Sequence, residues 1–145
     1  MQKKTVALTG SSGTMGWAGF KELYAKKDKF NIVVLNRDSK KNRDKFAAYE
    51  NDPAVKLVWG DLTNYEDVLE MVTGADYVLH VGGMVSPAAD YYPVKTQKTN
   101  VAAAQNIVNA VKAQPNPDAV KVVYIGTVAE TGDRNAPIHW GRTGD

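Results

Sequence analysis

Three glycines, each three residues after the last, carry the first chemical signal in this chain. Gly10, Gly13 and Gly16 follow a short apolar run and precede residues whose apolar members fall on one helical face. Gly10 would permit a tight turn, Gly13 would let a ligand approach the backbone, and Gly16 would let the helix pack closely on the strand. The helix N-terminus at Thr14 and Met15 would then present N–H groups to a pyrophosphate. A glycine-rich turn that serves geometry alone stays open, whereas a P-loop is excluded because no Gly-Lys-Ser/Thr follows.

The elements that would position this turn alternate along the chain, short apolar runs with longer amphipathic ones. This alternation predicts an α/β fold, a doubly wound parallel sheet of the Rossmann type with helices on both faces. Strands are expected at residues 5–8, 32–35, 55–59, 77–81 and 120–125, and the third, which Lys56 interrupts, is expected at an edge. Helices are expected at residues 16–24, 41–49, 65–72 and 101–111. Thr63 and Glu66 predict a capping box for the third helix, and Gly74 predicts its end.

Length and composition fit one domain outside a membrane. The 145 residues are 43% hydrophobic, carry a formal charge of +2 and include no cysteine. The absence of cysteine excludes disulfides, thiolate metal ligands and a cysteine nucleophile, and we expect no metal site. The modest charge gives no basic face for nucleic acid. No apolar run reaches the roughly 18 residues of a membrane span and no secretory signal is visible, so we expect no membrane partner and a cytoplasmic protein.

The pattern of strands and helices stops near residue 125. We therefore expect a Rossmann domain over residues 1–125 and a loop region over residues 126–145, which has no clear period. A sheet that ended with residues 120–125 would expose an apolar edge. This predicts a longer natural protein, truncated here before its last strands and a substrate domain.

Five short segments, in order along the chain, resemble the extended short-chain dehydrogenase/reductase superfamily and in particular its NAD(P)-dependent epimerase/dehydratase family. Residues 9–16 resemble the TGxxGxxG turn of that family. The other four segments are residues 60–62, 80–84, 100–101 and 124–127. Together they fall at the carboxyl ends of successive expected strands, where open α/β sheets bind ligands.

The resemblance implies contacts with both ends of a dinucleotide. Asp61 and Leu62 resemble a pair that contacts adenine, where a carboxylate can accept the adenine amino group. Residues 81–83, which are Val81, Gly82 and Gly83, resemble a segment that lies under the ribose and nicotinamide. Asp61 has an alternative role in starting the following helix.

Three further residues take their interpretation from the same resemblance. Thr127 matches the active-site Ser or Thr that positions the substrate oxygen. Asn100 matches a helix-opening element that contacts the cofactor, and the alternative is that it caps its helix. His80 is more simply interpreted as a core histidine than as a catalytic one.

The end of the second strand predicts which dinucleotide is preferred. An NAD site places a carboxylate there for the ribose hydroxyls, but this chain has Asn36 followed by Arg37. The missing carboxylate removes repulsion of a 2′-phosphate, and Arg37 can bind that phosphate, so NADP is preferred over NAD. The alternative is that Arg37, Lys40, Lys41 and Arg43 form a solvated helix start, and the adjacent Asp38 weakens the NADP interpretation.

The catalytic base that the resemblance implies is not visible. It would be a Tyr-x-x-x-Lys pair on a helix after the fifth strand, with both side chains on one face. The one match, Tyr91 to Lys95, precedes that strand and has Pro93 inside it, so we interpret it as a decoy. We therefore expect the 145-residue chain alone to be inactive, although it can still bind nucleotide.

Two functions from different classes follow. The first is an NAD(P)-dependent oxidoreductase, epimerase or dehydratase that acts on a hydroxyl or carbonyl of a small molecule, such as a nucleotide sugar, ketone or alcohol; an NADPH-dependent reductase is favoured. The second is a non-catalytic NADP-sensing or interaction domain of the same fold. A homodimer is possible, with the expected helix near residues 101–113 as its contact surface.

Overall fold

A computed structural model describes residues 2–127 of the chain. In chain order its strands and α-helices are β1 (Lys4–Thr9), α1 (Thr14–Tyr24), β2 (Phe30–Asn36), α2 (Lys40–Phe46), β3 (Val55–Trp59), α3 (Tyr65–Val72), β4 (Tyr77–His80), α4 (Ala88–Tyr91), α5 (Pro93–Lys112) and β5 (Lys121–Tyr124). Short 3₁₀ turns at Ala47–Tyr49 and Pro117–Ala119 precede β3 and β5. Each predicted strand is present, with ends that differ from the expected ones by no more than two residues.

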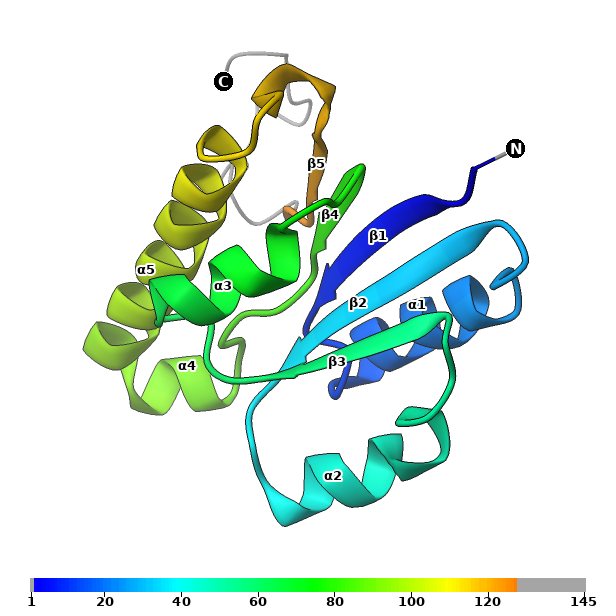
Figure 1. The fold of residues 1–145 in the computed structure, drawn as a ribbon. Helices are drawn as coiled ribbons and strands as arrows, with labels where there is room; N and C mark the ends of the chain where they lie inside the picture. The colour runs from blue at the N-terminus through cyan, green and yellow to red at the C-terminus, as the bar shows by residue number, and fades with distance from the viewer. Residues whose placement is uncertain (1, 128–145) are drawn as a thin grey trace, which may run out of the picture.

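The strands form one parallel sheet in the order β3-β2-β1-β4-β5 (Figure 1). This order confirms the predicted doubly wound fold and puts β3 at an edge. Lys56 of β3 is exposed there, and its ammonium lies 3.0 Å from Glu70 of α3. The chain reverses its direction of growth between β1 and β4, so their carboxyl ends flank the crevice where such sheets bind ligands.

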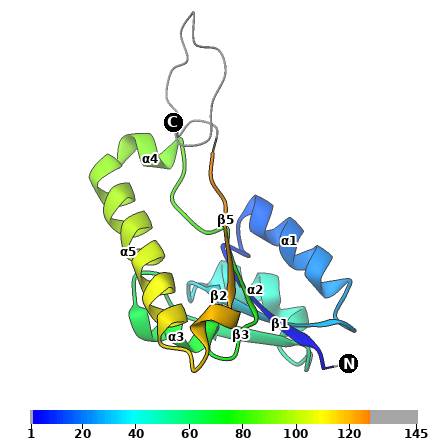
Figure 2. The ribbon, with the colours of Figure 1, turned by 90° about the horizontal axis from the view of Figure 1, so that it is seen from above.

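Helices cover both faces of the sheet, and Figure 2 shows α1 and α5 on opposite sides. Adjacent residues of a strand point to opposite faces, so Leu8 packs with Phe20 of α1 and Phe46 of α2, whereas Ala7 packs with the α3 and α5 residues Val68 and Ile107. Both faces of the central strands are buried. This double burial explains why these strands are continuous apolar runs in the sequence.

Two local predictions about helix ends are wrong. The N-cap of α3 is Asn64, whose side chain accepts the Glu66 N–H at 3.0 Å, so Thr63 does not form the predicted capping box. Helix α5 begins at Pro93 instead of near residue 101, and a short helix, α4, precedes it. Proline suits this first position because its missing N–H would have no helical partner there. Gly74 was predicted to end α3, and it has a φ of +77° just beyond that helix, a conformation that favours glycine.

Candidate functional site

The turn after β1 requires glycine at two positions because the backbone is crowded. Gly10 has a φ of +71°, and a Cβ there would lie 2.7 Å from the backbone of Gly82, in the segment after β4. A Cβ on Gly16 would overlap the carbonyl oxygen of Gly10. The Gly13 N–H donates to that same oxygen at 2.9 Å. The segments after β1 and β4 therefore meet, and the turn folds tightly against the start of α1.

Thr14 and Met15 open helix α1 directly after this turn. Gly13 is the N-cap and supplies no side-chain hydrogen bond to the helix. The first N–H groups of an α-helix have no partner within the helix, so those of α1 are available to an anion. The Met15 side chain is 67% exposed at this end of the sheet.

A buried hydrogen-bond network joins β1 to the segment after β4. The Thr9 hydroxyl oxygen accepts the N–H groups of Val81 at 3.1 Å and Gly82 at 2.9 Å, and it lies 2.9 Å from Nδ1 of His80. Burial lowers the pKa of His80. The lowered pKa favours the neutral imidazole, and because the Thr9 oxygen already accepts two N–H groups, its own proton is best directed to Nδ1. His80 is 7% exposed and acts as a bonded core residue, in agreement with the simpler interpretation of the sequence.

Asn100 holds the next part of the same segment. The residue lies in the interior of α5, away from its ends. Its side-chain Oδ1 accepts the Met84 N–H at 2.8 Å, and Nδ2 donates to the Met84 carbonyl at 3.0 Å. A Cβ on Gly83 would lie 3.4 Å from the Asn100 oxygen. The helix-cap alternative is wrong because α5 starts at Pro93. Asn100 instead fixes the path of the backbone after β4.

Asp61 and Leu62 follow β3 and reach the same end of the sheet. Oδ1 of Asp61 accepts the Thr63 N–H at 2.8 Å and the Thr63 hydroxyl at 2.7 Å, and these bonds hold the carboxyl pKa below its usual value. This geometry is the helix-start alternative, and it uses one of the two carboxylate oxygens. The Leu62 carbonyl accepts Nδ2 of Asn106 at 2.9 Å, and its side chain contacts the position where a Cβ on Gly82 would lie.

Asn36, at the end of β2, has a buried donor without an acceptor. The residue is 3% exposed, and its Oδ1 accepts the Ser11 hydroxyl at 3.0 Å. Its Nδ2 is buried and has no hydrogen-bond partner within residues 2–127. Buried amide donors are nearly always paired, because an unpaired one costs free energy. This donor, together with the tight cradle at Gly10, fits a polar ligand such as the predicted dinucleotide.

The basic residues after Asn36 separate into two groups. Arg43 binds both carboxylate oxygens of Asp38, at 2.6 and 2.8 Å, and lies 4.7 Å from the centre of the Trp59 ring. Its guanidinium holds the pKa of Asp38 below the usual value. Arg37 is exposed, and its side chain makes no ion pair in the described part of the chain. Asp38 is thus neutralised by Arg43 and not by Arg37, whose charge instead helps to lower the pKa of Asp61.

The residues expected to carry catalysis are only partly described. Thr127 follows β5 and is exposed, and the Ile125 N–H donates to the His80 carbonyl at 3.3 Å. Tyr91 ends α4 whereas Lys95 lies in α5, so this pair does not share one helix. Residues 128–145, the remainder of the predicted loop region, lie outside the described residues. Between residues 2 and 127, no cluster of His, Asp and Glu is suited to a metal ion, and no helix is long and apolar enough to cross a membrane.

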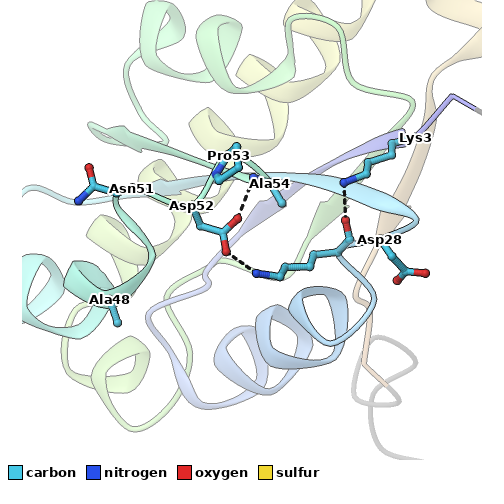
Figure 3. A pocket seen from close by; sticks show the side chains of 8 residues that line it. Lys3, Asp28, Ala48, Asn51, Asp52, Pro53 and Ala54 are labelled. Carbon is cyan, nitrogen blue, oxygen red and sulfur yellow. Dashed lines mark hydrogen bonds and ion pairs between the residues drawn. The ribbon is translucent and has the colours of Figure 1, made fainter.

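A shallow hollow of about 650 Å³ lies at the other end of the sheet, where β1, β2 and β3 begin (Figure 3). It is lined by Lys3, Lys27, Asp28, Ala48, Asn51, Asp52, Pro53 and Ala54. The Asp52 carboxylate accepts Nζ of Lys27 at 2.6 Å and the Tyr24 hydroxyl at 2.8 Å, and Nζ of Lys3 donates to the Lys27 carbonyl at 2.8 Å. These charged groups bind one another and tie α1 to the loop before β3. The hollow is therefore a structural junction, remote from the carboxyl ends of the strands.

Comparison with known proteins identifies the family that shares this turn and sheet. A family model described as "NAD dependent epimerase/dehydratase family" matches residues 6–142. The chain belongs to the NAD-dependent epimerase/dehydratase family. Among the curated relatives of this family member, the UDP-glucose 4-epimerase of Rickettsia massiliae (strain Mtu5) is 33% identical over 129 residues. That match covers 86% of this chain and 36% of the relative, so the chain spans about a third of the relative's length.

Solved structures agree with the fold of this family member. Pen from Bacillus thuringiensis matches with a TM-score of 0.68 and 25% identity, covering 78% of this chain and 35% of that one. WbmH from Bordetella bronchiseptica, solved in complex with NAD⁺, matches with a TM-score of 0.67 and 22% identity, covering 90% of this chain and 41% of that one. The Rossmann architecture predicted from the sequence is confirmed.

Proposed function

We propose that this chain is the dinucleotide-binding part of an enzyme that uses a nicotinamide cofactor to act on a hydroxyl or carbonyl of a small molecule. The observation that carries the proposal is the meeting of two backbones: Gly10 lies against Gly82 at the point where the strand order reverses. A bound dinucleotide would supply the hydride donor or acceptor. The residues of this chain bind and orient it.

Each segment of the site has a distinct task in this proposal. The N–H groups that open α1 bind the pyrophosphate, because they carry partial positive charge. The carboxylate oxygen of Asp61 that Thr63 does not use accepts the adenine amino group. The 81–83 segment, held by Thr9 and followed by Met84, which Asn100 holds, lies beneath the ribose and nicotinamide, and the Thr127 hydroxyl positions the substrate oxygen.

We infer that the preferred cofactor is NADP. Asn36 is neutral where an NAD site has a carboxylate, and its unpaired Nδ2 is a donor suited to a phosphate oxygen. Arg37 adds a positive charge that forms no ion pair within 4 Å in the described residues, and this charge helps to lower the pKa of Asp61. Titrations with NADPH and NADH test this, first with the natural protein and then with Arg37→Ala and Asn36→Asp. Both variants are expected to shift the preference towards NADH. A ratio of the two dissociation constants, for NADPH and for NADH, that is unchanged in both variants would refute the NADP inference.

The substrate class we favour is a nucleotide sugar, since the curated relatives are named UDP-glucose 4-epimerases. The NADP inference in turn favours a reductase, which consumes the cofactor, over an epimerase, which returns the hydride. Stoichiometric oxidation of NADPH by the full-length protein would support the reductase. We also propose that the 145-residue chain alone has negligible turnover, because its Tyr91 and Lys95 lie on separate helices; measurable turnover would refute this.

We further propose a homodimer through α5. Val94, Val101 and Val108 recur every seven residues on that helix and are 66, 60 and 45% exposed. An apolar stripe of this period suits packing against a second helix. Analytical ultracentrifugation of the protein over a range of concentrations would detect the dimer, and a monomer at every concentration would exclude it.

A further inference from the structure

The segment that follows β3 is held by side chains of two different helices. The Asp61 N–H donates to Oδ2 of Asp67, in the first turn of α3, at 2.8 Å. The Leu62 carbonyl accepts Nδ2 of Asn106, in α5, at 2.9 Å. The backbone of the Asp61–Leu62 dipeptide is therefore bound at both ends, which gives the dipeptide one defined position at the carboxyl end of the sheet.

Gly60 leaves the space that the Asp67 carboxylate occupies. A Cβ on Gly60 would overlap that carboxylate. The backbone conformation of Gly60 does not itself require glycine, because among the described glycines only Gly10 and Gly74 have a positive φ. The Gly60 N–H donates to the Asn36 carbonyl at 2.9 Å and so continues the pairing of β3 with β2. The absence of a side chain at residue 60 is thus explained by Asp67.

Asp67 fixes the backbone of Asp61, and Thr63 fixes its side chain. Oδ1 of Asp61 accepts both the N–H and the hydroxyl of Thr63, which leaves Oδ2 to face a ligand. The hydrogen bond from the Thr63 hydroxyl is the main cause that lowers the pKa of Asp61, so this side chain is an anion near neutral pH. A carboxylate oxygen only accepts hydrogen bonds. Held in one direction, Oδ2 binds an amino group, which donates, and repels an oxo group, which does not.

We propose that Asp67 is a positioning residue, which holds Asp61 so that the site selects a purine with a 6-amino group over one with a 6-oxo group. This inference rests on the proposed dinucleotide site, and Asp67 acts in it through Asp61. Glu66 is the other acidic residue in the first turn of α3. It is exposed and makes no ion pair in the described residues, so it shares the charge and the helical turn of Asp67 without the contact.

The test compares Asp67→Ala with Glu66→Ala, a matched loss of one carboxylate from the same turn. Isothermal titration of the natural protein and its variants gives the Kd for NADPH and for the analogue in which hypoxanthine replaces adenine. The natural protein and Glu66→Ala are expected to bind NADPH about tenfold more tightly than the analogue, because only adenine donates to a charged group. In Asp67→Ala this ratio is expected to fall to about two, since a small displacement of Asp61 weakens that hydrogen bond. Asp67→Asn is expected to keep the ratio, because its amide oxygen can accept the same N–H.

The outcomes separate this inference from the proposed function. A ratio in Asp67→Ala equal to that in Glu66→Ala would overturn the inference, because a loss of fold alone weakens the binding of both nucleotides equally. A natural protein that binds the two nucleotides equally would also overturn it and would leave the dinucleotide site intact. A natural protein that binds neither would overturn the dinucleotide site itself, and the inference with it. Should Asp67→Ala fail to fold, Gly60→Ala displaces the same carboxylate with a methyl group; the ratio is again expected to fall, and an unchanged ratio overturns the inference.

Discussion

Replacing Thr9 by valine tests whether one hydroxyl group holds the site together. Valine keeps the shape of the side chain and removes the oxygen, which leaves the N–H groups of Val81 and Gly82 and Nδ1 of His80 without their partner. Thr9 and His80 are buried, so Nδ1 of His80 would be left without a partner in the core. A buried polar group left unpaired costs about 1–3 kcal/mol, and with some relaxation of the segment we expect a total loss of about 3 kcal/mol. That loss is a large fraction of the stability of an ordinary domain.

Urea unfolding, followed by circular dichroism, measures this loss. With an m-value of about 2 kcal/mol/M, the midpoint is expected to fall by about 1.5 M. Thr5→Val is the control, because Thr5 lies in the same strand and its hydroxyl makes no hydrogen bond within the described residues. A midpoint for Thr9→Val no lower than that of Thr5→Val would refute the proposed network. Loss of NADPH affinity should accompany the loss of stability, since the same hydroxyl fixes the 81–83 segment.

Three other predictions address the turn, the opposite edge and the outer helix. Gly16→Ala is expected to abolish nucleotide binding because its Cβ would overlap the Gly10 carbonyl, whereas Gly19→Ala, a helical position with nothing within 4 Å, should bind normally and raise the free energy of unfolding by about 1 kcal/mol. The Lys27 ammonium is the main cause that lowers the pKa of Asp52 to about 2; the carboxylate therefore stabilises the fold above about pH 4 and loses this effect as the pH falls towards about 2. Urea midpoints measured across that range should fall less steeply in Asp52→Asn, and identical slopes would contradict the ion pair. Val101→Glu should shift the sedimentation of a dimer to that of a monomer, and an unchanged dimer would exclude α5 as the contact.

The strands and the first turn could be predicted because their signals are local. Continuous apolar runs and the spacing of Gly10, Gly13 and Gly16 need no knowledge of distant residues. The edge position of β3 could also be predicted, because Lys56 breaks the apolar run at a place that only an exposed strand tolerates. These features predict the fold class, which the structure confirms, and the end of the sheet at which we propose that a ligand binds.

The roles of Asn100 and Asn106 could not be predicted, because each depends on a partner far away in the chain. Asn100 was expected near the start of its helix, and only the early start of α5 at Pro93 turns its amide towards Met84. Asn106 is one of several amides in the sequence of α5, and its contact with the Leu62 carbonyl arises when α5 packs beside α3. The predicted N-cap of α3 was wrong for a more local reason. Asn64 and Thr63 are both residues that cap helices well, and the Thr63 hydroxyl donates to Asp61 instead.

We propose above all that the backbone N–H groups at the start of α1 bind the paired phosphates of a dinucleotide. The most direct measurement is a titration of the ¹⁵N-labelled protein with NADPH and NADH, followed by amide chemical shifts. We expect saturable shifts at Gly13, Thr14, Met15 and Gly16, with smaller ones at Gly82, and none at the hollow around Lys3 and Asp52. Saturation without shifts at the turn, or shifts confined to the end of the sheet where β1, β2 and β3 begin, would refute binding of the phosphates at α1.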